Sequence, residues 1–438
     1  MSALFSRAER DSVARSGITL TVQNLLLSSA PILTVALVGR MSGDSLHVRG
    51  LYQPAAFALL AVIIGLGTSA QVATARALGA GKPSQVRGFL VRLFGLGSAV
   101  TAVLVGGCVF LTSVLDPPLA FLLLSMVLAL PFAIAGELVS AALRGAGAVG
   151  ASTALTAGHV LVNTGTVGAL GLTAGLGLAA LPIATVIAGG AEFVLGAVLL
   201  YRRGLLNQNQ AGDPVTRVLP VFLGIGLPTA GVSILLFLVT LALVSIATPF
   251  GPYAVTAVAL GTVLEGLALA PAFGYGITMG TLMNRALEAG DGDRARSVFR
   301  RGTTQAAIGY GLLTLLMLVA GPPIAALLTT DTASRTAVAE YLDIVGPAFG
   351  ATGIVVTAFT VVQQLGFGVF TLLLNVGYFA AVLTIGTVVT ANGPLEFLYW
   401  TLSLAAATSA VTGFPLACWI STRATRPTSR AVNRKTTT

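Results

Sequence analysis

Residues 76–87 read RALGAGKPSQVR, and residues 285–296 read RALEAGDGDRAR. Six of the twelve aligned positions are identical, and the two copies begin about half a chain apart in a sequence of 438 residues. Each copy follows a long apolar run. The repeat therefore predicts two similar halves, each with the same polar turn after its second apolar segment.

The composition predicts a membrane protein. Hydrophobic residues make up 55% of the chain and charged residues only 9%, with a mean hydropathy of +0.92. A soluble domain of this length needs far more surface charge. The apolar runs are long enough to cross a bilayer as helices, and they are continuous rather than alternating, which excludes strands of a membrane barrel. We therefore expect an all-α integral membrane protein.

The apolar runs predict twelve transmembrane helices. Six precede a polar stretch at residues 202–217 and six follow it. The predicted segments are 17–39, 51–74, 89–114, 119–142, 151–172, 176–201, 218–247, 253–280, 303–328, 337–361, 366–390 and 395–420.

The basic residues predict the orientation. With the amino terminus inside, the inner loops and tails hold all but three of the 24 lysines and arginines. The three exceptions are Arg40, Arg49 and Arg335. Because positive charge gathers on the cytoplasmic side, both termini are expected in the cytoplasm.

The repeat then defines the expected domains. Residues 1–201 form an amino-terminal six-helix lobe, 202–217 a cytoplasmic linker, 218–422 a carboxy-terminal six-helix lobe, and 423–438 a basic cytoplasmic tail. Two lobes of the same orientation imply a pseudo-two-fold axis along the membrane normal. Such an arrangement is typical of transporters that work by alternating access.

Other classes of function find little support in the sequence. The net charge of +9 lies almost wholly in loops, so membrane topology accounts for it and no nucleic-acid partner is expected. We find no metal cluster, Walker loop or nucleophile motif, so neither an enzyme nor a bound cofactor is expected. A proton or sodium gradient is the expected energy source.

Several motifs resemble one transporter family. The repeated turns are similar to the loops after helices 2 and 8 of the multidrug and toxic compound extrusion (MATE) family. Further similar stretches are ALVGRMSG (36–43), LRGAGAVG (143–150), LVNTGTVGALGLTAGLGLAALPIATVIA (161–188) and GIGLPTAG (224–231). The resemblance is clearest in residues 17–300 and thins past residue 330. The repeated motif of the major facilitator superfamily, with Asp-Arg or Asp-Lys before a glycine, is absent from both copies.

The resemblance implies export of amphipathic organic compounds, most simply cations, by proton antiport across the plasma membrane. The bilayer and a small organic substrate would be the partners, and the protein would act as a monomer. Two alternatives stay open. One is a flippase for lipids or lipid-linked saccharides in the same superfamily, although the spans hold almost no arginine. The other is an uncoupled facilitator.

The resemblance also implies a cation site in the first lobe, of two acids, an asparagine and a threonine. Asn163 and Thr185 match the neutral members, whereas Thr34 and Val167 occupy the positions of the acids. The acid that many members carry on helix 7 falls at Leu236. The charges through which the family usually couples transport in the first lobe are therefore missing from these positions.

Two other residues are candidates for proton coupling. Glu265 lies about 18 Å into its predicted helix, near the midplane, where burial disfavours the charged carboxylate and favours a bound proton. It is also similar to a glutamate that many family members carry on this helix. His159 lies four residues before Asn163 on the same helix face and could titrate in place of a lost acid. Alternatively, Glu265 is structural and His159 bonds a backbone carbonyl.

The remaining candidates concern the cavity and its gating. Glu137 and Arg144 are seven residues apart, so they could pair on one helix, and Glu192 shares a face with Thr185. Pro31 and Pro228 lie inside helices and permit kinks that could gate transport or simply serve packing. Five aromatic residues could line a cavity for flat cations or face lipid: Tyr52, Phe57, Phe273, Tyr275 and Tyr378.

Overall fold

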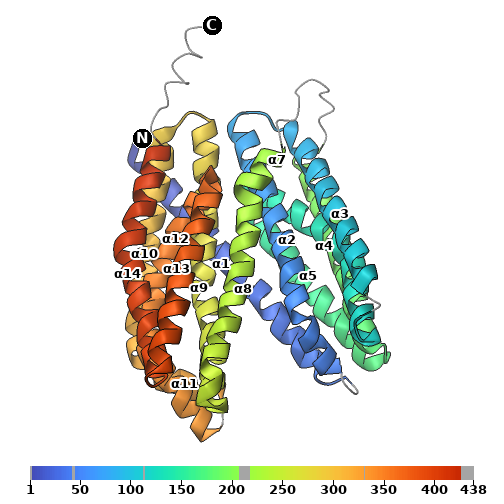
Figure 1. Cartoon of the computed structure of the whole chain (residues 1–438). Helices are drawn as coiled ribbons and strands as arrows, with labels where there is room; N and C mark the ends of the chain where they lie inside the picture. The colour runs from blue at the N-terminus through green and yellow to red at the C-terminus, as the bar shows by residue number, and fades with distance from the viewer. Residues whose placement is uncertain (1, 42–44, 112–113, 207–217, 330, 426–438) are drawn as a thin grey trace. The chain divides into compact units, whose positions relative to one another are not determined.

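The computed structural model describes residues 2–41, 45–111, 114–206, 218–329 and 331–425. The side chains of residues 2–12 and 46 are outside this description. Most of the expected linker, from residue 207, and most of the expected tail, from residue 426, also lie outside it. The described residues form helices joined by short turns, with no strand among them (Figure 1). The all-helical prediction is confirmed.

The elements up to residue 250 follow the first seven predicted segments closely. Three of them end in or contain wider or tighter turns: α5 continues as a π-helix, α6 starts from a 3₁₀ turn, and a π-turn precedes α8. The bounds are α1 (Ser2–Val38), α2 (Ser45–Gly79), α3 (Gln85–Leu111), α4 (Pro117–Gly145), α5 (Val149–Thr166), η1 (Val167–Thr173), η2 (Gly177–Ala179), α6 (Ala180–Arg202), α7 (Val218–Val221), η3 (Phe222–Gly226), α8 (Leu227–Ala247) and η4 (Thr248–Phe250).

The second half contains two very long helices followed by shorter ones. Its elements are α9 (Pro252–Glu288), α10 (Gly292–Leu328), α11 (Thr332–Val345), α12 (Ala348–Val362), η5 (Gln363–Phe367), α13 (Gly368–Ala391) and α14 (Glu396–Ala424). Among the described residues, ten helical stretches are long and apolar enough to cross a membrane.

One predicted segment is wrong as a single helix. The structure divides 337–361 into α11 and α12 at a turn over Gly346 and Pro347, because proline has no amide hydrogen for the helix ladder and its ring clashes with the carbonyl one turn earlier. The predicted break between 361 and 366 is present: at Gly366 the backbone takes a φ of 108°, so the 44-residue stretch Ala348–Ala391 is two helices.

The chain forms two compact units. Unit 2 is Val22–Ser233, and unit 1 is Met1–Thr21 together with Ile234–Thr438. Each boundary therefore falls within a helix, α1 in one case and α8 in the other.

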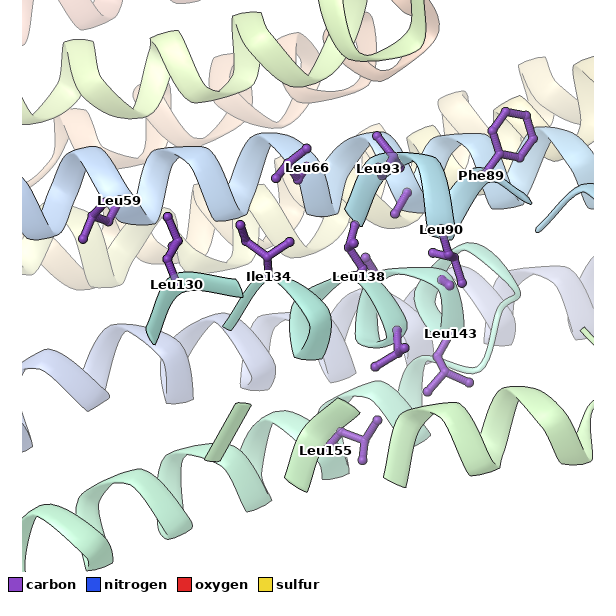
Figure 2. Packing of buried hydrophobic residues seen from close by; sticks show 14 of the residues in the cluster. Leu59, Leu66, Phe89, Leu90, Leu93, Leu130, Ile134, Leu138, Leu143 and Leu155 are labelled. Atoms are coloured by element: carbon purple, nitrogen blue, oxygen red, sulfur yellow. The ribbon is translucent and has the colours of Figure 1, made fainter. Parts of the chain in front are cut away.

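The core of unit 2 lies where α4 packs between its neighbours. Leu130, Ile134 and Leu138 of α4 point toward leucines of α2 and α3 (Figure 2), and each is at most 2% exposed. Contacts between such side chains stabilise the packed state mainly through dispersion. The hydrophobic effect contributes little here, since the surrounding lipid is equally apolar. The α4 helix is thus the central helix of this unit.

The repeated sequence builds the same turn twice. After α2, the Lys82 amide donates to the Ala77 carbonyl (2.8 Å) and Gly81 has a φ of 69°. After α9, the Asp291 amide donates to the Ala286 carbonyl (2.9 Å). Gly290 there has a φ of 78°. Both turns are Schellman motifs, which need a left-handed residue, so the conserved spacing of Ala-Gly has a direct structural cause.

Candidate functional site

A buried polar network lies inside unit 2. The amide of Gln23, on α1, is 2% exposed and reaches two hydroxyls on α5. Its Nε2 donates to Thr156 Oγ1 (2.8 Å) and to Ser152 Oγ (3.3 Å). The Oγ atom of Ser140, on α4, lies 2.8 Å from the Oγ atom of Ser152, and the two hydroxyls share a hydrogen bond. Because buried polar groups need partners, this network fixes α1, α4 and α5 to one another.

Arg144 extends the network to α2. Its Nη2 pairs with Glu137 Oε1 at 2.5 Å, its Nε donates to Gln71 Oε1 at 3.0 Å, and its Nη1 donates to Ser152 Oγ at 3.3 Å. The arginine is 9% exposed. The predicted pairing of Glu137 with Arg144 is confirmed. Each of the three guanidinium nitrogens therefore has a partner within the protein.

A second charged pair lies next to the first. His159 Nδ1 on α5 is 2.9 Å from Glu192 Oε2 on α6. The two atoms lack the alignment of a hydrogen bond, so the contact is an ion pair when the imidazole carries a proton. Glu192 is 7% exposed, while the imidazole is 24% exposed. His159 therefore pairs with a carboxylate, whereas the sequence left open a bond to a backbone carbonyl.

Glycines bring the carboxylate of Glu192 against α4. A Cβ atom at Gly136 would lie 2.9 Å from Glu192 Oε2 and 3.0 Å from the Gly189 carbonyl oxygen. Gly189 in turn lies against the backbone of Phe132, since a Cβ at Gly189 would lie 2.7 Å from the Phe132 carbonyl oxygen. Small residues allow this close approach of α4 and α6, and the approach places Glu192 beside Glu137.

Among the described residues, no hydrogen bond joins the side chains at the positions that the resemblance assigns to a first-lobe cation site. Within the described chain, the Thr34 hydroxyl donates to the Ala30 carbonyl (2.9 Å) and the Thr185 hydroxyl to the Leu181 carbonyl (3.0 Å). Val167 is fully buried in the apolar core of unit 2. Asn163 is half-buried on α5. At the two positions where the resemblance implies acids, this chain therefore has the buried core residue Val167 and Thr34, whose hydroxyl bonds its own helix.

The two prolines have different surroundings. Helix α1 continues through Pro31. Pro228 is the second residue of α8, directly after the π-turn Phe222–Gly226. Such a turn relieves the missing amide and the ring clash that proline causes. The turn packs tightly on α2, since a Cβ at Gly65 would lie 2.7 Å from the Gly226 carbonyl oxygen.

In unit 1, Glu265 lies half-buried in the middle of α9. Its charge interacts with the hydroxyls of Tyr341 on α11 and Tyr378 on α13. In the described residues no lysine, arginine or histidine lies within ion-pair distance of it. One turn earlier, Gly261 leaves room for the Tyr341 ring. Glu265 is therefore a carboxylate among tyrosines.

Tyr275 takes part in helix packing. Its ring contacts α1, where a Cβ at Gly17 would be 2.9 Å from Tyr275 Cε1. The sequence analysis did not identify four residues described above: Gln23, Gln71 and Ser152 in unit 2, and Tyr341 in unit 1. A glutamine within a long apolar run is the signal that could have found the first two, because amides are rarely left unpaired in a membrane.

Comparisons with known proteins place the geometry in context. A family model described as MatE matches residues 228–389, which includes part of the stretch beyond residue 330. No curated protein sequence matches the chain.

Two solved structures with the same fold are distant from this chain in sequence. The bent form of the Vibrio cholerae MATE transporter VcmN has a TM-score of 0.86 at 20% identity, covering 96% of this chain and 98% of that one. A MOP superfamily transporter from Pyrococcus furiosus, whose binding pocket is described as having reverse polarity, has a TM-score of 0.84 at 15% identity. That match covers 96% of this chain and 97% of the other. Residues 228–389 therefore match the MatE family model, and nearly the whole length of the chain has the fold of the multidrug and toxic compound extrusion transporters.

Proposed function

We propose that the protein is a secondary active transporter that exports amphipathic organic compounds, above all cations, in exchange for protons. The family is one of membrane transporters, so movement of compounds across a membrane is the activity that it implies. In this proposal twelve segments cross the plasma membrane and both termini lie in the cytoplasm. The protein acts as a monomer whose two lobes, 1–201 and 218–422, expose the substrate site alternately to the two sides of the membrane.

The observation that carries the proposal is the setting of Glu265. It lies 13 residues after the first residue of α9, about 20 Å along the helix. A half-buried carboxylate without a basic partner among the described residues favours either a proton or a bound cation. Because proton and organic cation would compete for the same charge, release of one would follow binding of the other. Competition of this kind is the basis of antiport.

The first half favours one alternative, the uncoupled facilitator. Thr34 and Val167 carry no charge, and Val167 is fully buried in the apolar core. If Glu265 were structural as well, substrate would move down its own gradient. A flippase for anionic lipid headgroups has less support, because the buried Arg144 is already paired with Glu137.

Efflux of ethidium from proteoliposomes tests the proposal. The wild-type protein is compared under a pH gradient, a sodium gradient and no gradient. We expect the pH gradient alone to accelerate efflux, and Glu265→Gln to remove that acceleration. Glu288→Gln is the matched control, since Glu288 makes the same charge change on the same helix at an exposed position.

Each other outcome has a definite meaning. If neither gradient matters while ethidium still crosses, the protein is a facilitator and Glu265 is structural. If Glu265→Gln responds to the pH gradient as the wild type does, coupling through this residue is wrong. If ethidium never crosses, organic cations are the wrong substrate class and lipids come next.

A further inference from the structure

Unit 2 contains two buried arginines, and their surroundings differ. Arg144 on α4 is 9% exposed, and each of its guanidinium nitrogens has a partner, including the carboxylate of Glu137. Arg49 on α2 is 8% exposed. Among the described residues, no carboxylate lies within ion-pair distance of Arg49. One buried guanidinium thus has a counter-charge in the described part of the chain, and the other has none.

The contacts of Arg49 leave most of its donors available. Its Nη1 donates to Oε1 of Gln53, one turn later on α2, at 2.6 Å. Its guanidinium carbon lies 5.4 Å from the ring centroid of Tyr52, which is buried. A guanidinium has five N–H donors, and the described residues provide no hydrogen-bond partner for Nε or Nη2 of Arg49. Both partners of this arginine are therefore neutral, and two of its nitrogens lack an acceptor.

The free energy of such a site favours a bound anion. Burial removes much of the water that would stabilise the charge, and an amide oxygen does not replace a counter-ion. The contact with the Tyr52 ring offsets part of this cost. The guanidinium fork matches a phosphate or carboxylate with two parallel hydrogen bonds, which would use the donors that remain. The space beside Arg49 is open, since a Cβ at the next residue, Gly50, would meet nothing within 4 Å.

The position of Arg49 along α2 indicates the source of the anion. Arg49 is the fifth residue of the helix, and the apolar run begins two residues later at Leu51. The 35 residues of α2 extend over about 52 Å, whereas the hydrocarbon core of a bilayer is about 30 Å thick. The first turn of α2 therefore extends to the level of the lipid headgroups, where tyrosine is also enriched. The anions concentrated at that level are lipid phosphates.

We propose that Arg49, together with Gln53 and Tyr52, forms a binding site for the phosphate group of a membrane lipid at the first turn of α2. Nε and Nη2 bond two phosphate oxygens, Gln53 holds Nη1, and the Tyr52 ring covers the guanidinium. The lipid is a bound neighbour of the protein and not its transported compound. The inference therefore goes beyond the proposed function, and it holds or fails without regard to antiport.

Lipid binding to the purified full-length protein tests the site. After delipidation in detergent, native mass spectrometry counts bound phosphatidylglycerol and bound dioleoylglycerol, which lacks the phosphate. We expect Arg49→Gln to bind phosphatidylglycerol at least about tenfold more weakly than the wild type does. Arg49→Lys keeps the charge without the fork and should bind with intermediate strength. Arg40→Gln is the matched control, because Arg40 is exposed at the turn after α1, and this variant should bind as the wild type does.

Thermal unfolding provides a second readout, which a purely structural arginine would not produce. Without lipid, Arg49→Gln should unfold at no lower temperature than the wild type, because the variant removes an uncompensated charge. Added phosphatidylglycerol should stabilise the wild type by mass action and leave the variant unchanged. An arginine that serves packing alone would instead lower the unfolding temperature of the variant equally with and without lipid, and that result overturns the proposal.

The remaining outcomes are equally definite. If Arg49→Gln binds phosphatidylglycerol as tightly as the wild type, or if dioleoylglycerol binds equally well, the phosphate site is wrong. If inorganic phosphate stabilises the wild type as much as the lipid does, the ligand is a free anion and the lipid assignment is wrong. Asp44 is the acid nearest to Arg49 in the sequence, and it lies outside the described residues. If selective lipid binding occurs only in Asp44→Asn, Asp44 is the counter-charge of Arg49 and the proposal is overturned.

Discussion

Arg144 and Glu137 form an ion pair two turns apart on α4, with an N···O distance of 2.5 Å. The same guanidinium holds Gln71 of α2 and Ser152 of α5. One side chain therefore connects three helices of unit 2. Because both charges are mostly removed from solvent, the pair is costly to break by removing one partner alone.

Arg144→Gln should destabilise the protein by about 3 kcal/mol, because it leaves the Glu137 carboxylate buried without its counter-charge. The double variant with Glu137→Gln should recover a large part of that loss. Thermal unfolding in detergent measures both. Equal losses in the single and double variants would mean that the hydrogen bonds to Gln71 and Ser152, rather than the ion pair, carry the effect.

The two copies of the repeated turn should respond alike to substitution. Gly81→Ala and Gly290→Ala each place a Cβ in the left-handed conformation, at a cost of about 1 to 2 kcal/mol. Gly95→Ala is the control, since that glycine lies in α3 with open space around it. The control should lose no stability, because alanine favours a helix interior. A loss at only one of the two turns would contradict their structural equivalence.

Much of the fold was predictable because the sequence signals are local. Apolar runs give the helices, and the Ala-Gly spacing of the repeat gives the turns at Gly81 and Gly290. The spacing of seven between Glu137 and Arg144 places both on one helix face, and they do pair. Each of these signals depends only on residues close together in the chain.

The rest depends on contacts between distant residues. Gln23 meets Thr156 across 133 positions, and His159 meets Glu192 on another helix. No periodicity within one helix predicts which partner faces it. The division of 337–361 at Pro347 was missed for a different reason: its apolar pattern continues through the turn, so hydropathy alone could not locate the break.

Asp331 should make the start of α11 sensitive to acid. Its carboxylate accepts a hydrogen bond from the Ser334 amide (2.8 Å), and hydrogen bonds from Ser334 hold the pKa of Asp331 below its usual range. The stabilisation is therefore present above the ordinary carboxyl pKa and is lost as the pH falls through the lowered value.

Hydrogen exchange in the first turn of α11 measures this effect. Protection should decrease in acid for the wild type. Asp331→Asn keeps an oxygen for the cap without a titrating group, so its protection should not change over the same range. If both proteins lose protection equally, the acid sensitivity comes from elsewhere in the chain.

Tyr341→Phe should stabilise the protein. The ring is completely buried, and packs edge-on against Tyr399 with centroids 5.0 Å apart, but its hydroxyl has no hydrogen-bond partner among the described residues. Removing an unpaired buried hydroxyl should gain about 1 kcal/mol while keeping the ring contacts.

Tyr310→Phe is the matched control, because the Tyr310 hydroxyl donates to the Ala268 carbonyl at 3.0 Å. That variant should lose about 1 kcal/mol. Thermal unfolding of the two variants should thus shift in opposite directions. A loss of stability in Tyr341→Phe would show that the hydroxyl has a partner. Glu265, whose charge interacts with this hydroxyl, would be the first candidate.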